Sequence, residues 1–318
     1  MTDATVAVVV PCYKVKSHIE RVLYAMPDFV SAVYVVDDAC PDRTGRHVEE
    51  AIRDPRVKVL FHETNQGVGG AVLTGYAAAL TDGADIVVKV DGDDQMDLSQ
   101  LGKIIRPILE GKADYTKGNR FSSVESIEPM PRIRIFGNAI LSIFNKVSSG
   151  YWNITDPTNG YTAIHRGVLA KLSFVKISRR YFFESDLLFR LSLLRAVVVD
   201  VPMDAIYGDE KSGINISRIL GPFISGHIRN FLKRIVYQYY LREWNVASFE
   251  LPLALALLTF GIVASIYTWL DGLQTHSAAA PGTVMIDALP LIFGLQLMLS
   301  FINYDVESTP KIPRQDLD

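Results

Sequence analysis

The chain has 318 residues, with 32 Lys and Arg against 35 Asp and Glu and a formal net charge of -3. This balance excludes a protein that grips nucleic acid over a broad basic face, and no nucleic-acid partner is expected. Two cysteines are too few for a disulfide framework. The mean hydropathy of +0.18 is high for a soluble enzyme, and the apolar excess is concentrated near the C-terminus.

Apolar runs rich in Val and Ile alternate with segments whose apolar residues recur at helical spacing. Strands are expected at 6–10, 32–36, 57–61, 86–90, 113–117 and 197–201. Helices are expected between most of them, for example over 71–80 and 98–109. Strands that alternate with helices in this way indicate βαβ units and a mainly parallel sheet.

The run that begins at Ile86 ends in a cluster of carboxylates, Asp91-Gly92-Asp93-Asp94-Gln95-Met96-Asp97. Open α/β sheets bind their ligands at the carboxyl ends of strands, which is where these residues fall. The clustered acids repel one another unless a cation lies among them, and Mg²⁺ prefers such oxygen donors. A solvated acidic turn is the alternative interpretation. The second strand also ends in acid, at Asp37 and Asp38.

A glycine-rich loop, with Gly67, Gly69 and Gly70, precedes the alanine-rich helix over 71–80. Backbone N–H groups at a helix start attract anions, so the loop could cradle a phosphate. Tight packing of the helix on the sheet explains the glycines equally well, and both interpretations stay open.

A segment at about 132–147 has apolar residues at helical spacing and is flanked by Arg132, Arg134 and Lys146. It predicts either an ordinary amphipathic surface helix or an interface helix whose basic residues face lipid phosphates. A basic juxtamembrane helix is expected over 221–246, after a catalytic domain over 1–220.

Two apolar segments near the C-terminus, at about 249–270 and 285–304, predict a transmembrane hairpin within 247–318. The second is the shorter, and a re-entrant or interfacial hairpin is the alternative for it. The linker over 271–287 contains no Lys or Arg, whereas basic residues lie before the first span and after the second. This asymmetry predicts a multi-pass protein of the inner (cytoplasmic) membrane, with the catalytic domain and the C-terminus in the cytoplasm.

Four stretches together resemble the polyprenyl-phosphate (dolichyl-phosphate mannose synthase-like) group of family 2 glycosyltransferases. They lie at 8–13, 35–44, 65–71 and 91–95, and the resemblance covers about residues 5–220. It implies an α/β fold of the GT-A type: a Rossmann-like, mainly parallel sheet, followed by amphipathic interface helices and the two-helix transmembrane hairpin.

The resemblance also implies a donor site for a nucleotide sugar. Asp93 and Gln95 would hold Mg²⁺ or Mn²⁺, which offsets the charge on the leaving nucleoside diphosphate. Asp91 would contact the ribose or sugar side or help to orient the metal, and Asp38 would bind the base or ribose. The implied donor-binding residues are Pro11, Tyr13, Asp37, Asp38, Gly67, Asp91 and Gly92.

The acceptor of this group is a lipid phosphate, here an undecaprenyl-type polyprenyl phosphate. A phosphate monoester is already anionic near neutral pH, so it needs cations more than a general base. Arg120 matches the family's acceptor arginine, and Arg132 or Arg134 would be the second clamp. Asp156 and Glu184 would contact sugar hydroxyls. The implied catalytic residues are Asp91, Asp93, Arg120, Asp156 and Glu184.

The resulting hypothesis is an inverting transfer of one sugar from a donor of the UDP-glucose or GDP-mannose type to polyprenyl phosphate. One alternative is a family 2 transferase that acts on a saccharide hydroxyl in polysaccharide synthesis, in which case an acid would serve as the base. A second alternative is an inactive membrane scaffold. The sequence does not specify which sugar is transferred. Self-association through the amphipathic helices or the hairpin is compatible with the sequence.

Overall fold

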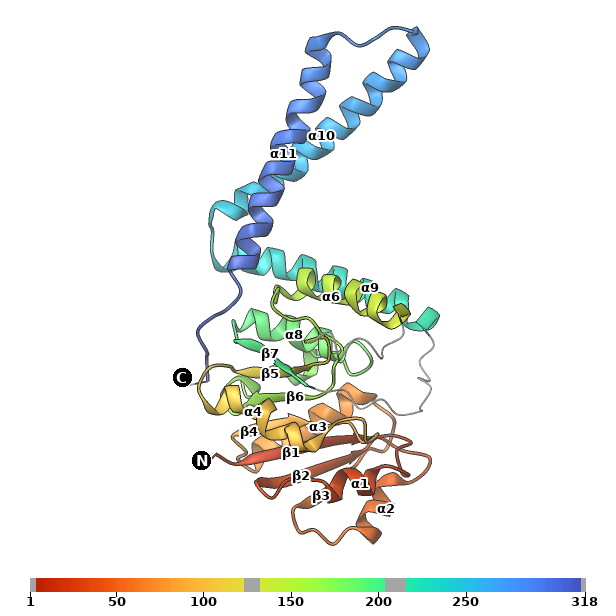
Figure 1. Cartoon of the computed structure of the whole chain (residues 1–318), viewed down its shortest axis with the longest axis vertical. Helices are drawn as coiled ribbons and strands as arrows, with labels where there is room; N and C mark the ends of the chain where they lie inside the picture. The colour runs from red at the N-terminus through yellow and green to blue at the C-terminus, as the bar shows by residue number, and fades with distance from the viewer. Residues whose placement is uncertain (1–3, 123–131, 204–215, 316–318) are drawn as a thin grey trace. The chain divides into compact units, whose positions relative to one another are not determined.

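The computed structural model describes residues 4–122, 132–203 and 216–315, with the side chains of 132–134 and 216–219 left out. The chain divides into two compact units (Figure 1). Unit 1 comprises Met1–Leu232 and Pro310–Asp318, and unit 2 comprises Lys233–Thr309. The expected boundary at residue 220 remains a prediction.

Within the described residues, unit 1 is built on a seven-stranded mixed sheet with the order β3-β2-β1-β4-β6-β5-β7. Among the strands of the described residues, only β6 runs antiparallel to its neighbours, so the expected mainly parallel α/β sheet of the GT-A type is confirmed. The strands are β1 (Val6–Cys12), β2 (Val30–Asp37), β3 (Val57–Phe61), β4 (Ile86–Lys89), β5 (Tyr115–Asn119), β6 (Thr162–His165) and β7 (Val198–Pro202).

Helices cover both faces of this sheet, which is why β1 is apolar along its whole length. Successive side chains of a strand point to opposite faces. Val8 and Val10 of β1 accordingly pack in one core with α1, α2 and α4, and Val9 packs in the other with α3 and α8. The helices are α1 (Ile19–Tyr24), α2 (Thr44–Ala51), α3 (Val68–Thr81), α4 (Leu101–Leu109), α7 (Arg166–Leu169) and α8 (Phe183–Leu193).

Close packing explains part of the glycine pattern of α3. A Cβ on Gly75 would overlap with the side chain of Val9 in β1, and one on Gly69 would lie 2.7 Å from Cδ2 of Phe183. Gly67 differs, since its φ of +88° is one that side-chain-bearing residues rarely adopt. Packing therefore accounts for Gly69, whereas Gly67 is required by the backbone of the loop.

An outer layer of two helices, α6 (Arg132–Ser149) and α9 (Ile216–Val236), lies beyond α8 (Figure 1). Ser148 Oγ of α6 lies 2.7 Å from Nδ1 of His227 in α9, which joins the two helices. Within unit 1 these helices leave large apolar side chains exposed: Phe136, Ile140, Ile143, Phe144, Leu220, Ile228 and Leu232. An exposed apolar stripe beside basic residues is typical of a helix at a membrane interface.

Unit 2 contains the two helices of the described chain that are long and apolar enough to cross a membrane, α10 (Val246–Thr275) and α11 (Pro281–Glu307). Only 11% and 17% of their most apolar windows are buried, so neither is the core helix of a soluble domain. Small residues let them approach closely, since a Cβ on Gly261 would lie 2.7 Å from Leu291 Cγ. These helices contain the predicted spans and fit a membrane anchor.

The last described residues belong to unit 1. The backbone N–H of Arg314 donates to both carboxylate oxygens of Asp114, at 2.7 and 2.9 Å. Asp114 is fully buried and also accepts the N–H of Val197 at 2.7 Å. The polypeptide therefore leaves unit 1 through α9 and returns to it after α11.

Asp114→Ala is expected to lower the unfolding temperature of the detergent-solubilised protein. The substitution leaves the N–H groups of Val197 and Arg314 without this acceptor, at a cost of about 2 kcal/mol or more. Asp114→Asn is the matched control, because its amide oxygen still accepts and a smaller loss is expected. An unchanged unfolding temperature for Asp114→Ala would show that the returning tail does not stabilise unit 1.

Candidate active site

A pocket of about 630 Å³ opens at the carboxyl ends of β1, β2 and β4. It lies at the point where the strand order changes direction between β1 and β4, the usual ligand position in open α/β sheets. The pocket is lined by Pro11, Cys12, Tyr13, Val15, Asp38, Asn65, Gly67, Val68, Ala71, Asp91, Gly92, Asp93, Arg180 and Tyr181. The residues expected to bind the donor are thus brought together, except Asp37.

Asp38 organises one wall of the pocket. Its carboxylate accepts the backbone N–H groups of Gln66 and Gly67, each at 2.8 Å. His62 Nδ1 lies 2.7 Å from Asp38 Oδ1, and His62 Nε2 lies 2.8 Å from the hydroxyl of Thr74 in α3. Asp38 therefore ties the end of β2 to the glycine loop at the start of α3.

Asp37 has a different position although it is the next residue. Its Oδ1 accepts the N–H of Cys40 at 2.7 Å, and its Oδ2 accepts the N–H of Gly45 at 2.6 Å. Both carboxylate oxygens thus shape the loop that leads into α2. The expected donor contact of Asp37 stays a prediction.

The acidic loop after β4 places Asp91, Gly92 and Asp93 in the pocket lining. Asp93 Oδ1 accepts the N–H of Gln95 at 3.2 Å, and Gln95 is not among the lining residues. Asp94 has a φ of +62° and pairs with Arg21. In this loop, therefore, Asp91 and Asp93 line the pocket, whereas the carboxylate of Asp94 pairs with Arg21 instead.

The carboxylates of the acidic loop fit a hard divalent cation that takes its remaining ligands from the substrate. Within the described residues, no group of three or more His, Cys, Asp or Glu could hold a metal alone. Mg²⁺ typically takes one or two carboxylates together with substrate phosphates. Asp91 and Asp93, both facing a pocket with room for a nucleotide, match that pattern.

Lys89, the last residue of β4, is a buried cation that the sequence analysis did not assign. Its Nζ lies 2.8 Å from Asp91 Oδ1 and 3.3 Å from Oε1 of Glu184 in α8. Burial alone would lower the pKa of Lys89, but the carboxylates of Asp91 and Glu184 outweigh it and raise the pKa above its usual value. Lys89 is therefore charged and joins two of the predicted catalytic acids.

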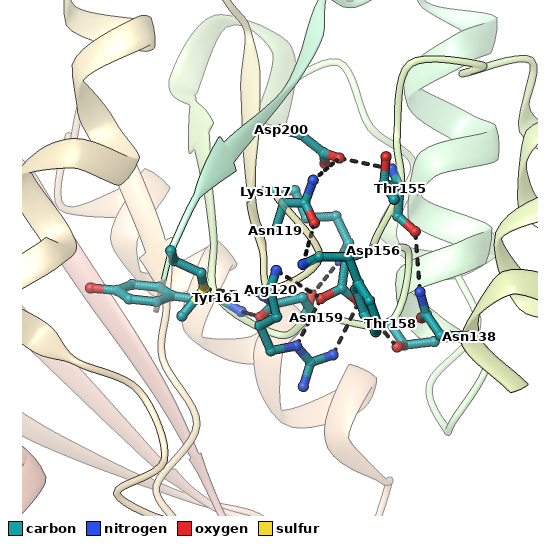
Figure 2. Close-up of polar contacts among 12 residues, drawn as sticks. Lys117, Asn119, Arg120, Asn138, Thr155, Asp156, Thr158, Asn159, Tyr161 and Asp200 are labelled. Atoms are coloured by element: carbon teal, nitrogen blue, oxygen red, sulfur yellow. Dashed lines mark hydrogen bonds and ion pairs between the residues drawn. The ribbon is translucent and has the colours of Figure 1, made fainter. Parts of the chain in front are cut away.

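Arg120 and Asp156, which the sequence analysis treated separately, form a bidentate ion pair (Figure 2). Arg120 Nε and Nη2 donate to the two oxygens of Asp156 at 2.7 and 3.0 Å. The Asp156 side chain is fully buried, whereas that of Arg120 is 20% exposed. Asp156 therefore orients the guanidinium, and a sugar contact by Asp156 stays a prediction.

The loop that carries Asp156 is anchored to the sheet at two further points (Figure 2). Lys117 Nζ donates to the carbonyl of Asn159, and Asp200 accepts the N–H of Thr155 at 2.7 Å. Burial lowers the pKa of Lys117 to about 8 and raises that of Asp200 to about 6. Lys117 is fully buried, so its ammonium meets the carbonyl of Asn159 rather than water.

Arg132 and Arg134, the expected second phosphate clamp, have side chains outside the described residues. Arg180, which the sequence analysis missed, lines the pocket together with Tyr181. The basic and aromatic stretch before α8 could have indicated it, although no spacing rule places that stretch at the ends of β1 and β4.

The chain is similar to curated proteins along most of their length. It is 28% identical to UDP-N-acetylglucosamine–dolichyl-phosphate N-acetylglucosaminyltransferase of Methanococcus voltae, over 65% of this chain and 88% of that protein. It is 32% identical to undecaprenyl-phosphate mannosyltransferase of Micrococcus luteus, over 62% and 82%. It is 30% identical to polyprenol monophosphomannose synthase of Mycolicibacterium smegmatis, over 71% and 88%.

The fold is similar to crystal structures of glucosyl-3-phosphoglycerate synthase from Mycobacterium tuberculosis. A complex with Mn²⁺, UDP and glucosyl-3-phosphoglycerate superposes with a TM-score of 0.52 at 20% identity, covering 73% of this chain and 80% of that one. A complex with Mn²⁺, UDP and phosphoglyceric acid gives 0.53 at 20% identity, over 73% and 78%. Residues 7–173 match the model of the family described as glycosyl transferase family 2. The chain therefore belongs to glycosyl transferase family 2 and is a glycosyltransferase.

Proposed function

We propose that the protein transfers one sugar from a nucleotide-diphosphate sugar, of the UDP-glucose or GDP-mannose type, to a polyprenyl phosphate. The observation that carries the proposal is the pocket that presents Asp91 and Asp93 at the carboxyl end of β4. The curated relatives support the acceptor class, since the three described above are named for dolichyl, undecaprenyl or polyprenol carriers.

The donor occupies this pocket with its diphosphate near the acidic loop. Asp93 and Gln95 would hold a Mg²⁺ or Mn²⁺ ion, which would neutralise charge on the departing nucleoside diphosphate. The fold relative bound to Mn²⁺ and UDP is consistent with this assignment. Asp38, Pro11 and Tyr13, which also line the pocket, bind the base and ribose.

Arginine side chains present the acceptor. A phosphate monoester carries between one and two negative charges near neutral pH, so one of its oxygens attacks the anomeric carbon without a general base. The bond between that carbon and the donor's β-phosphate oxygen breaks, and the nucleoside diphosphate leaves with the electron pair. Arg120 binds the acceptor phosphate, with Arg132 or Arg134 as a further clamp, whereas Arg180, which lines the pocket, contacts the donor's diphosphate.

The path of the chain supports the proposed membrane arrangement. Residues on both sides of unit 2 belong to unit 1, which supports an out-and-back hairpin of two spans. The basic residues at both ends of the hairpin favour a cytoplasmic catalytic unit and C-terminus. The exposed apolar stripe on α6 and α9 would contact the bilayer surface that delivers the acceptor.

The direct test is incubation of the purified protein with a panel of nucleotide sugars, Mn²⁺ or Mg²⁺ and undecaprenyl phosphate. Formation of a polyprenyl-phosphate-sugar, seen as a labelled lipid that mild acid hydrolyses, is the expected result. Sugar transfer to a saccharide hydroxyl, with none to the lipid, would contradict the proposed acceptor.

Asp93→Ala is expected to abolish turnover and Mn²⁺-dependent binding of the cognate nucleoside diphosphate, because one of the metal's ligands is lost. Calorimetric titration with and without Mn²⁺ measures the binding step. Asp94→Ala is the matched control, since Asp94 pairs with Arg21 and does not line the pocket. Wild-type turnover by a folded Asp93→Ala variant would contradict the metal assignment.

Arg180→Ala is expected to weaken nucleoside diphosphate binding about tenfold, consistent with a lost charge-assisted hydrogen bond worth about 1.5 kcal/mol. Arg179→Ala is the neighbouring control, because Arg179 donates to Gln66 Oε1 at 2.8 Å and does not line the pocket. Equal affinities of the two variants would remove Arg180 from the donor site.

Arg120 is tested together with its buried partner, because loss of the arginine alone strands the carboxylate of Asp156. The double variant Arg120→Gln, Asp156→Asn is expected to raise the KM for undecaprenyl phosphate about tenfold or more while nucleoside diphosphate affinity changes little. Asp156→Asn alone controls for the altered loop. An unchanged KM for the lipid would exclude Arg120 from the acceptor site.

A further inference from the structure

We propose that Lys89 is a positioning residue whose buried ammonium fixes the carboxylate of Asp91, which lines the pocket, relative to the carboxylate of Glu184 in α8. The inference rests on the proposed function and adds a residue to it. Asp91 follows β4 in the acidic loop, and Glu184 lies in the first turn of α8, so Lys89 joins two separate elements.

The geometry is that of a charge bridge. Lys89 Nζ lies 2.8 Å from Asp91 Oδ1 and 3.3 Å from Glu184 Oε1. The Lys89 side chain is 2% exposed, against 31% for Asp91 and 16% for Glu184. The cation is therefore enclosed, while Asp91, which lines the pocket, keeps access to the site.

Filling the core does not explain a lysine at this position. The other residues of β4 are Ile and Val, and burying an ammonium is unfavourable until its partners compensate the charge. An apolar side chain of similar size would pack in the core without that cost. The lysine instead provides a charge that holds two carboxylates at a set separation, where they would otherwise repel.

The strand register places a second buried lysine in the same row. Lys89 pairs with Thr162 of β6, Thr162 pairs with Lys117 of β5, and Lys117 pairs with Asp200 of β7. Directly paired residues share a face of the sheet. Lys117 holds the carbonyl of Asn159, next to Gly160, so the loop that carries Asp156 is anchored beside the bridge.

Gly160 shows how closely this loop covers the bridge. A Cβ added to Gly160 would lie 2.5 Å from Lys89 Nζ and would overlap with Asp91 Oδ2. The loop therefore approaches the ion pair as closely as a glycine permits. A methyl group here would displace the bridge without removing any of its charges.

Two pairs of variants test the inference. Lys89→Met removes the charge and Lys89→Arg keeps it, whereas Gly160→Ala pushes on the intact bridge. Gly102→Ala is the control, because a Cβ at Gly102 in α4 meets nothing within 4 Å. Initial rates are measured with the nucleotide sugar, Mn²⁺ and undecaprenyl phosphate. Each rate is divided by the concentration of binding sites found by titrating nucleoside diphosphate in the presence of Mn²⁺. Misfolded protein is then not counted.

Lys89→Met is expected to lower kcat per site about 100-fold, the scale of a misplacement of about 1 Å at a reacting centre. Lys89→Arg is expected to stay within about tenfold of wild type. Gly160→Ala should lose about tenfold or more in kcat, and Gly102→Ala should match wild type. Such a loss in kcat per titrated site, with rescue by arginine, is not expected of a residue that only supports the fold.

A folded Lys89→Met variant with wild-type kcat would overturn the inference while leaving the proposed function intact. If Lys89→Met does not fold, the remaining variants decide: reduced turnover by Gly160→Ala supports the bridge, and wild-type turnover overturns it. Absence of turnover by the wild-type protein with every donor and acceptor would overturn the proposed function and this inference together.

Discussion

Compensation of buried charge at the carboxyl ends of β4 and β5 is the constraint on which the candidate site depends. Catalysis on a phosphorylated donor needs carboxylates and cations close together, but each is costly to remove from water unless it is paired. The structure meets this requirement with paired groups: Lys89 with Asp91 and Glu184, and Arg120 with Asp156. The pairing keeps these charged groups in fixed positions, and one of them, Asp91, lines the pocket.

Neighbouring acids in the sequence have different tasks because of local geometry. Asp37 ends β2, and its carboxylate accepts the N–H groups of the loop into α2. Asp38 is the next residue, and its carboxylate faces the glycine loop and the pocket. Asp37 therefore stabilises the loop into α2, whereas Asp38 lines the pocket. The sequence of the two adjacent aspartates does not reveal this difference.

The sequence predicts local features well and long-range pairings poorly. The strand expected at 57–61 is observed with those bounds, because β-branched and apolar residues specify a strand locally. Arg120 and Asp156 are 36 residues apart, so their ion pair depends on the fold. Lys89 and Lys117 were missed for a related reason, since a lysine in an apolar run does not reveal which carboxylate or carbonyl its ammonium meets. The antiparallel position of β6 likewise depends on tertiary pairing.

The chain's path restricts how a membrane anchor can serve this site. Unit 1 includes residues before α10 and after α11, and Arg314 donates to the fully buried Asp114 of unit 1. If a chain leaves and re-enters one folded unit, any crossings of a bilayer between the two points must be even in number, and the described part of unit 2 contains two helices long and apolar enough to cross. Within unit 2, Arg234 of α9 forms a buried bidentate pair with Asp305 of α11, which ties the start of the hairpin to its end. Because both ends are fastened, this pair resists separation of the two apolar helices.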